Sequence, residues 1–521
     1  MRVRRFVVPL MLAAAVLMAA CRSGPPSGPV VIYLVDTLRP DRMSVYGARR
    51  PTSPAAERLA RESVVYDNAF CVSTWTRPSV ATLLTSVLPS ASATLNRWGR
   101  LDDSAWYLPE ALQRQGWGTA AFVANGNLFD DRMGFKRGFD SFRTIVRAVP
   151  AGELTPGTEW HATAREVVDP VLEFVEAQKS PRFFLYVHVV DPHIPYVLRP
   201  EYAGLFADAT EPGSLVPLDY DRSVRQADDE FGRLAEALRK KGFWEEATVI
   251  YTSDHGEELG EHGRSGHGHS VFDEQLRVPL LVRYPRGESG GTRRPDPVSL
   301  ADVVPTIADR YALAPVPGWI GTSLWRNRLP ADRELYFTED LDQDRLYGLR
   351  RGPAKVIVRL YPTFERTVFF LDRDPGEQGG TGLPCGADRG AAPEMLASLR
   401  GWRERDAAAY PSLRFGAGRD RGHCEASIDL STVREPFLTW EDVCRWGSEV
   451  RGSQLVYRSD PGAPPERLLV SADDRGRHPE VEFLRGRTRC PVDTVKARYI
   501  EGPVSEQHLE RLRALGYLQG P

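Results

Sequence analysis

The chain has 521 residues, a formal net charge of −3 and a hydrophobic fraction of 42%. This length allows one large domain with an appendage, or two to three domains with sizeable cores. Because acidic and basic residues are mixed throughout and no block of like charge occurs, the composition excludes a protein that binds nucleic acid through a basic surface.

The N-terminus has the layout of an export signal. Three arginines precede an apolar run at residues 6–20, which is too short for an ordinary membrane-spanning helix. The run ends at Cys21, and a tether rich in Gly, Pro and Ser follows at 22–29. We therefore expect residues 1–21 to be a lipoprotein signal peptide, with Cys21 lipidated and the protein exported to the bacterial envelope, facing the periplasm or in the outer membrane. The alternative is an ordinary secretory signal or an N-terminal anchor, and either would also export the protein.

Strand and helix patterns alternate over residues 30–315. The first is a continuous apolar, β-branched run at 30–35, typical of a buried parallel strand. Further strands are expected at 64–70, 118–123, 183–190, 248–252 and 278–284, and helices at 53–62, 108–115, 162–178, 220–240 and 299–311. This alternation predicts an α/β fold with a mainly parallel sheet between two layers of helices.

The sequence pattern after residue 334 indicates smaller structural units. We expect a catalytic domain at 30–334 and an α+β subdomain at 335–409, with strands at 335–337, 354–359 and 367–371 and a helix at 393–408. Residues 410–503 predict a β-rich insertion module that could hold a protein or glycan partner, and 504–521 a C-terminal helix.

Four of the six cysteines cluster late in the chain, namely Cys385, Cys424, Cys444 and Cys490. In an oxidising compartment they favour two disulfides, with three possible pairings, that tie the insertion module together. Four buried free thiols are the alternative. Cys71 stands apart and is expected to be a small core residue.

Metal-binding side chains follow the predicted strands. Asp36 follows the strand at 30–35, and Asp254 and His255 follow the strand at 248–252. Open α/β sheets place their ligand chemistry at such carboxyl ends. Carboxylates and an imidazole, with the hydroxyl of Thr76, could hold one or two divalent cations. The histidine favours Zn²⁺ or Mn²⁺, and Ca²⁺ remains possible.

Thr76 lies where a polar stretch becomes a helical one. We expect it to be the N-cap of this helix, with Pro78 in the first turn. A hydroxyl there faces unpaired backbone N–H groups and the positive end of the helix dipole, which favours an anion. An ordinary threonine cap is the alternative.

These motifs resemble the sulfatase family of the alkaline phosphatase superfamily. The matching segments are 34–42, 46–47, 52–54, 75–85, 191–193, 252–257, 260–263, 266–268, 277–279, 302–306, 372–377 and 512–517. The resemblance implies the alkaline phosphatase-like fold and a divalent metal centre. It implies that Asp36, Asp254 and His255 are metal ligands and that Thr76 occupies the nucleophile position. It also implies that His193 contacts the substrate, and that His267 and His269 contact the substrate or a second metal.

Two residues depart from the family's nucleophile signature. Thr76 stands where a sulfatase has the Cys or Ser that becomes formylglycine, and Val80 stands where the signature has Arg. Threonine cannot form that aldehyde, because its Cβ carries a methyl group. Water must therefore attack a threonine ester directly, as in the superfamily's phosphatases, phosphodiesterases and phosphoryl transferases. The residue chemistry thus favours phosphorus esters, whereas the family favours sulfate esters.

The mechanism that we expect starts with Thr76 as a metal-bound nucleophile and passes through a phospho-Thr76 intermediate, with His193 or His267 carrying the proton. Arg39 or Arg77 could bind the substrate anion, or could form structural ion pairs. The alternatives to a hydrolase are a phosphoryl head-group transferase of the cell envelope and a catalytically silent envelope-binding lipoprotein.

Several nearby residues are expected to be structural. His188 alternates within a predicted strand and is interpreted as a packed core histidine, and Trp75 as a residue that packs the turn before the helix. Loop-structuring roles are expected for Glu257, Glu258, Glu261 and His262.

Overall fold

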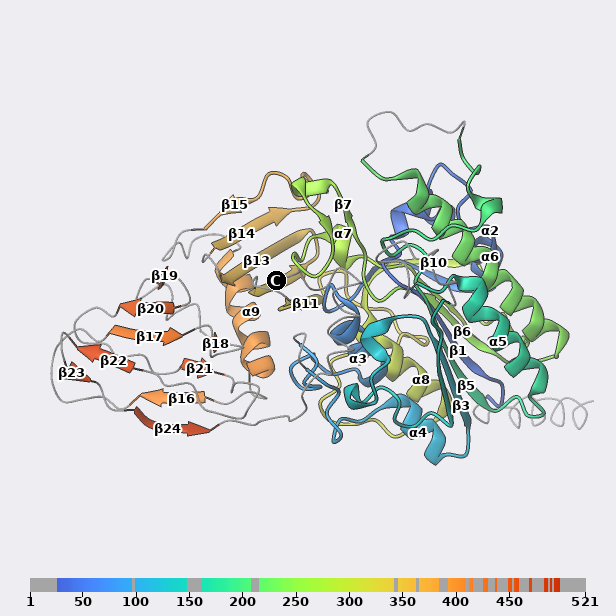
Figure 1. Cartoon of the computed structure of the whole chain (residues 1–521), viewed down its shortest axis with the longest axis horizontal. Coiled ribbons are helices and arrows are strands. Elements are labelled where there is room, and N and C mark those ends of the chain that lie inside the picture. Colours follow the sequence, from blue (N-terminus) through green and yellow to red (C-terminus); the bar gives the residue numbers. More distant parts are fainter. Residues whose placement is uncertain are drawn as a thin grey trace, which may run out of the picture.

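The computed structural model describes residues 26–95, 99–147, 161–207, 215–341, 345–361, 365–383 and 392–407, together with short strands between 412 and 496 (Figure 1). The expected signal peptide with Cys21, the four clustered cysteines with their disulfides, and the C-terminal helix lie outside the described residues. Within these ranges, no helix is long and apolar enough to cross a membrane.

An eight-stranded sheet forms the centre of the molecule, in the order β10-β2-β9-β6-β1-β5-β3-β4. Its strands are β1 (Val30–Val35), β2 (Val64–Phe70), β3 (Gly118–Val123), β4 (Ser141–Thr144), β5 (Phe183–Val189), β6 (Thr248–Thr252), β9 (Leu280–Arg283) and β10 (Thr292–Ser299). Strand β1 pairs in parallel with both β5 and β6. Only β9 among these eight is antiparallel to its neighbours, so the prediction of a mainly parallel sheet is confirmed.

Helices cover both faces of the sheet (Figure 1). They are α2 (Pro54–Ala60), α3 (Thr76–Thr85), α4 (Leu108–Arg114), α5 (Ala164–Ala177), α6 (Leu218–Lys240) and α8 (Val303–Tyr311). Alternate residues of β1 point into two separate cores, because successive side chains of a strand face opposite ways. Val30, Ile32 and Leu34 pack with α3, α4 and α8, and the residues between them pack with α2, α5 and α6.

A second, antiparallel sheet follows. Its strands are β11 (Glu334–Glu339), β12 (Arg345–Arg351), β13 (Ala354–Tyr361), β14 (Glu365–Phe370) and β15 (Thr381–Gly382). Helix α9 (Ala392–Ala407) packs on it through Leu396 and Leu399, which share a core with Tyr347 and Val356. The expected smaller α+β subdomain is therefore present.

Beyond α9, short strands form two further antiparallel sheets (Figure 1). One contains β16 (Ser412–Phe415), β18 (Pro436–Phe437), β21 (Leu468–Val470) and β24 (Val492–Lys496). The other contains β17 (Glu425–Asp429), β19 (Ser448–Arg451), β20 (Gln454–Arg458), β22 (Glu482–Arg485) and β23 (Thr488–Arg489).

Candidate active site

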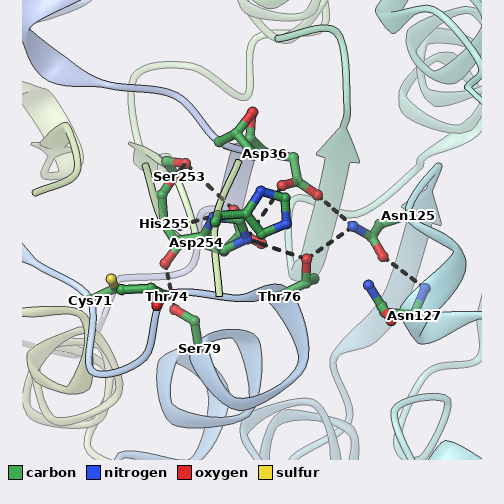
Figure 2. Close-up of polar contacts among 12 residues, drawn as sticks. Asp36, Cys71, Thr74, Thr76, Ser79, Asn125, Asn127, Ser253, Asp254 and His255 are labelled. Carbon is green, nitrogen blue, oxygen red and sulfur yellow. Dashed lines mark hydrogen bonds and ion pairs between the residues drawn. The ribbon is translucent and has the colours of Figure 1, made fainter. Parts of the chain in front are cut away.

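The carboxyl ends of two central strands meet the N-terminus of a helix at the candidate site (Figure 2). Asp36 follows β1, and Asp254 and His255 follow β6, which pairs in parallel with β1. Thr76, at the start of α3, lies against both strand ends. The side chains of all four residues are fully buried, so the fold assembles them in a site shielded from bulk water.

The position of Thr76 in its helix differs from the prediction. Helix α3 begins at Thr76 itself, and Trp75, in an extended conformation, occupies the N-cap position. Instead of capping the helix, the hydroxyl of Thr76 is 3.5 Å from Nε2 of His255 and accepts a hydrogen bond of 3.1 Å from Asn125. Ser79, one turn along, donates to the carbonyl of Asp254 (2.5 Å) and ties the helix to the end of β6.

The other three predicted metal ligands lie around the imidazole of His255. Nε2 of His255 lies 3.7 Å from Oδ1 of Asp36, 3.4 Å from Oδ2 of Asp254 and 3.5 Å from Oγ1 of Thr76. Ligand atoms of a tetrahedral site with bonds of about 2.1 Å are about 3.4 Å apart. The same two carboxylate oxygens are buried and accept no hydrogen bond from any described residue. Among the described acidic and histidine side chains, the group whose ligand atoms all lie within 4.8 Å of one another is Asp36, His188 and Asp254. The two carboxylates with a neighbouring imidazole therefore fit a divalent cation.

The charges in the site also favour a cation. Burial, followed by the charge of Asp36, raises the pKa of Asp254 to about 6. Burial alone would raise the pKa of Asp36, but its hydrogen bond with His188 and the nearby imidazoles hold that pKa far below its ordinary value. Burial opposes the charged form of His255, yet the two carboxylates raise its pKa. Two buried carboxylates repel each other, and a positive charge between them removes that cost.

His188 is fully buried in β5, as expected of a packed core histidine, but it also contacts a predicted metal ligand. Its Nε2 lies 3.1 Å from Oδ2 of Asp36, and its Nδ1 lies 3.0 Å from the hydroxyl of Tyr186. If the tyrosine donates to Nδ1, then Nε2 carries the proton and donates to the carboxylate. Ligand atoms of Asp36, His188 and Asp254 lie within 4.8 Å of one another. His188 is therefore a member of the possible ligand group, and its hydrogen bond to Asp36 also orients that carboxylate, as an outer-shell partner would.

Asn125 and Asn127 are site residues that the sequence analysis missed. They follow β3, another parallel strand, and Asn125 precedes the short helix η3 (Gly126–Leu128). The side-chain amide of Asn125 donates to Oδ2 of Asp36 (2.5 Å) as well as to Thr76. Its side-chain oxygen accepts a hydrogen bond from the backbone N–H of Asn127 (2.8 Å). The side chain of Asn127 is buried, and neither of its polar atoms has a hydrogen-bond partner among the described residues. Figure 2 shows both beside Thr76.

A group of buried imidazoles lines the site on another side. The ring of His267 lies 4.4 Å from that of His255 and 5.0 Å from that of His193, centroid to centroid. His161, another residue that the sequence analysis missed, lies 5.2 Å from His193. Burial, with the neighbouring His193, lowers the pKa of His161 to about 3. Burial also lowers the pKa of His193 and of His267, which favours the uncharged form of these rings.

Hydrogen bonds set the orientation of the two predicted proton carriers. Nδ1 of His193 lies 2.6 Å from the carbonyl of Ile194, to which it donates. In the neutral ring Nε2 is therefore the basic nitrogen. Nδ1 of His267 lies 3.1 Å from a carboxylate oxygen of Glu257. Glu257 was expected to structure the loop, and it does so by holding a predicted catalytic residue.

The contacts of the two predicted substrate-binding arginines are structural ones. Arg39 donates to both carboxylate oxygens of Asp41, to Glu261 and to the carbonyl of Glu257. Arg77 donates to the carbonyl of Gly99 and stacks on the ring of Trp75, 5.3 Å from its centroid. These contacts engage both arginines within the protein, as the structural alternative predicts, and the expected contact with the substrate anion stays a prediction.

His269 is held in the loop behind the site. The loop contains the short strands β7 (Glu258–Leu259) and β8 (Ser265–Gly266) and leads to α7 (Asp273–Leu276). Nε2 of His269 lies 3.0 Å from a carboxylate oxygen of Glu258 and 3.1 Å from the amide of Gln275. These contacts engage His269 within the loop, and the expected substrate contact stays a prediction.

Comparison with known families gives the family of this chain. The sulfatase family model matches residues 29–311, more than half of the chain. The chain belongs to the sulfatase family. Steryl-sulfatase of Mus musculus is 28% identical over 271 residues, which cover 42% of this chain and 41% of that protein. N-acetylglucosamine-6-O-sulfatase of Bacteroides thetaiotaomicron is 22% identical, with coverage of 67% and 81%. This chain thus spans less than two thirds of the first of these relatives and most of the second.

Solved structures share the fold. Phosphonate monoester hydrolase of Agrobacterium radiobacter aligns with a TM-score of 0.61 at 19% identity, over 74% of this chain and 96% of that one. A protein solved with its substrate D-glucosamine-2-N,6-O-disulfate aligns with a TM-score of 0.60, also at 19% identity, over 74% and 98%. At such identity the likeness shows the fold alone. Together with the family match, it confirms the expected alkaline phosphatase-like architecture.

Proposed function

We propose that this sulfatase-family chain is a metal-dependent ester hydrolase that prefers phosphorus esters and uses Thr76 as its nucleophile. The observation that carries the proposal is the position of Oγ1 of Thr76. This atom lies at the N-terminus of α3, 3.5 Å from Nε2 of His255. That imidazole in turn lies beside Oδ1 of Asp36 and Oδ2 of Asp254, which accept no hydrogen bond from any described residue.

The cation would be held by Asp36, Thr76, Asp254 and His255. When bound, it would lower the pKa of the threonine hydroxyl and offset the negative charge of the ester. A donor set that includes an imidazole favours Zn²⁺ or Mn²⁺ over Ca²⁺, which prefers oxygen ligands.

The protein groups around Thr76 suit attack on a tetrahedral anion. Oγ1 of Thr76 lies at the N-terminus of α3, which is the positive end of the helix dipole and favours an anion. Asn125 donates to Oγ1 of Thr76, which fixes the direction of the remaining lone pair. The buried amide of Asn127 can donate to an ester oxygen. Donors that are already oriented need no rearrangement as charge develops in the transition state.

The identity of residue 76 favours phosphorus over sulfur. Attack by the Thr76 oxygen forms an O–P bond and breaks the bond from phosphorus to the leaving alcohol, which takes up a proton. A water molecule must then displace phosphate from Thr76, because a threonine ester cannot be released through an aldehyde hydrate. Nε2 of His193, the basic nitrogen of that ring, can take the proton from this water.

The cellular setting is proposed on the sequence alone. We propose that the protein is exported and lipid-anchored through Cys21, and that its substrate is a small-molecule or envelope ester. The insertion module at 410–503 is the proposed site for a protein or glycan partner.

Turnover of three model esters tests the proposed function. The mature protein is incubated with an aryl phosphate, an aryl phosphodiester and an aryl sulfate, each in the presence of Zn²⁺, Mn²⁺ or Ca²⁺. We expect a higher kcat/KM for a phosphorus ester than for the sulfate ester. Faster turnover of the sulfate ester would overturn the proposed preference.

A further inference from the structure

A carboxylate of the C-terminal sheet reaches the segment that precedes Thr76. Glu339 is the last residue of β11, and its side chain is fully buried. One carboxylate oxygen, Oε2, accepts from the backbone N–H of Thr74 (3.0 Å) and from the hydroxyl of Ser73 (3.1 Å), and lies 2.6 Å from the hydroxyl of Thr74. Only Trp75 separates these contacts from the proposed nucleophile.

The other oxygen of Glu339 fixes the carboxylate to its own strand. Oε1 accepts from the backbone N–H groups of Asp340 and Leu341, both at 2.9 Å. Oε1 is thereby held by the end of β11, and Oε2 faces Ser73 and Thr74. A backbone hydrogen bond from Thr338 to the carbonyl of Val72 (2.9 Å) lies beside this contact.

The end of β11 also meets the loop that carries His267. The hydroxyl of Thr74 donates to the carbonyl of Ser270 (2.8 Å). Leu341 fills the space beside Gly268, where an added Cβ would lie 2.5 Å from Leu341 and 3.5 Å from Trp75. The end of β11 therefore contacts both the residues that precede Thr76 and the loop that carries His267.

A count of protons suggests how the contact works. The hydroxyl of Thr74 has one proton but lies within hydrogen-bond distance of two acceptors, the carbonyl of Ser270 and Oε2 of Glu339. If Glu339 is a neutral acid, its own proton bonds to Thr74, and the hydroxyl remains free to donate to Ser270. Burial raises the pKa of Glu339, which favours this neutral form at the junction.

We infer that Glu339 is a positioning residue that aligns Thr76 for attack, so that the C-terminal sheet completes the active site. The inference rests on the proposed role of Thr76 as the nucleophile. Glu339 touches neither the metal ligands nor the nucleophile, and acts by fixing the backbone at Thr74. Displacing a reacting atom by about 1 Å can cost about a hundredfold in rate, so loss of this support should lower kcat rather than raise KM.

The test compares substitutions at Glu339 with one at a matched carboxylate. Glu377 is the control, because it is also buried and also accepts a backbone N–H across the same two units, from Asp273 at 2.6 Å. The variants Glu339→Ala, Glu339→Gln and Glu377→Gln are assayed for kcat and KM on the phosphorus ester that the native protein turns over fastest. Metal content and amide hydrogen exchange of peptides covering 70–80 are measured on the same samples.

We expect Glu339→Ala to lower kcat about a hundredfold, to leave KM and metal content nearly unchanged, and to speed exchange at 73–76. Glu339→Gln keeps the neutral shape but loses one backbone contact, so it should retain kcat to within about tenfold. Glu377→Gln should keep kcat and the exchange of this segment, even if the melting temperature falls.

Three results would overturn the inference. The first is a folded, metal-loaded Glu339→Ala with native kcat, and the second is an equal loss of kcat in Glu377→Gln. If Glu339→Ala does not fold, Glu339→Gln decides. Because this variant loses the contact with the backbone N–H of Thr74, exchange at 73–76 should become faster, and unchanged exchange there is the third result. Failure of the proposed function is a separate outcome, because it appears as undiminished turnover by Thr76→Ala whatever Glu339 does.

Discussion

Oγ1 of Thr76 lies 3.5 Å from Nε2 of His255, although 179 residues separate them in the chain. The contact exists because β6 ends beside the N-terminus of α3, where Ser79 fastens the helix to the carbonyl of Asp254. A hydroxyl and an imidazole at this spacing do not form a good hydrogen bond, but they suit two ligands of one cation. The following predictions depend on that relationship.

Removing one buried carboxylate should weaken metal binding but stabilise the metal-free fold. Asp254→Asn is expected to abolish binding of the cation and yet to make the metal-free protein more stable at pH 8. Burial and Asp36 raise the pKa of Asp254 to about 6. Above that pH the charged form opposes folding, by on the order of 3 kcal/mol. Thermal unfolding with and without a chelator measures both effects. A variant that is less stable than the native protein in chelator would contradict the like-charge argument.

The histidine behind Asp36 should tune metal affinity. His188→Gln is expected to weaken cation binding by about 10- to 100-fold, because outer-shell partners orient the ligands that they contact. Competition with a metal-sensitive dye gives the dissociation constant. His262→Gln is the matched control, since His262 stacks on Phe272 and pairs with Glu274 instead. Equal affinities for both variants would show that His188 is only a core residue.

A buried acid outside the site should give the protein a measurable pH dependence. Asp228 accepts from the backbone N–H groups of Ala55 (2.6 Å) and Ala56 (2.9 Å) at the start of α2, and burial raises its pKa to about 7. A raised folded-state pKa stabilises the protein below the ordinary value of 3.8, and this contribution is lost as the pH rises through 7.

Asp228→Asn should therefore remove part of this pH dependence. Between pH 5 and 8, the free energy of unfolding is expected to fall more steeply in the native protein than in the variant. The difference accumulates to on the order of 3 kcal/mol, and urea denaturation at several pH values measures it. Parallel curves would show that Asp228 stays charged in the folded state.

Activity should require a residue with a hydroxyl group at position 76. Thr76→Ala is expected to lower kcat by at least about a thousandfold, whereas Thr76→Ser keeps the oxygen and should remain active on phosphorus esters. Metal content of both variants is the control, because Thr76 is also a proposed ligand. A Thr76→Ala enzyme that keeps its cation and its activity would rule out a covalent route through this residue.

The central architecture was predictable because its signals are local. Runs such as 30–35 and 183–190 are almost entirely apolar, as strands buried on both faces must be, and the acids that follow them stand out. Strands β4, β10 and β12 were missed. Strand β10 contains two prolines and a register shift between Arg294 and Pro297, and such residues rarely indicate a strand.

The missed site residues lack a local signal. Asn125 and Asn127 follow a strand as the acids do, but amides are common in turns and do not suggest a metal site. His188 sits in an apolar strand, so its contact with Asp36 depends on the pairing of β1 with β5. For Arg39, its partner Glu261 lies 222 residues away in the chain. Such pairings become visible only once the sheet order is known.

The most direct test of the central claim is to look for the phosphoryl group on the enzyme. The metal-loaded protein is mixed with a saturating aryl phosphate, quenched in acid during turnover and digested, and its peptides are analysed by mass spectrometry. We predict one phosphoryl group on the peptide that contains residue 76, located on Thr76 by fragmentation and lost after the substrate is exhausted. Steady turnover with no modification of that peptide, or with the phosphoryl group on another residue, would contradict the account.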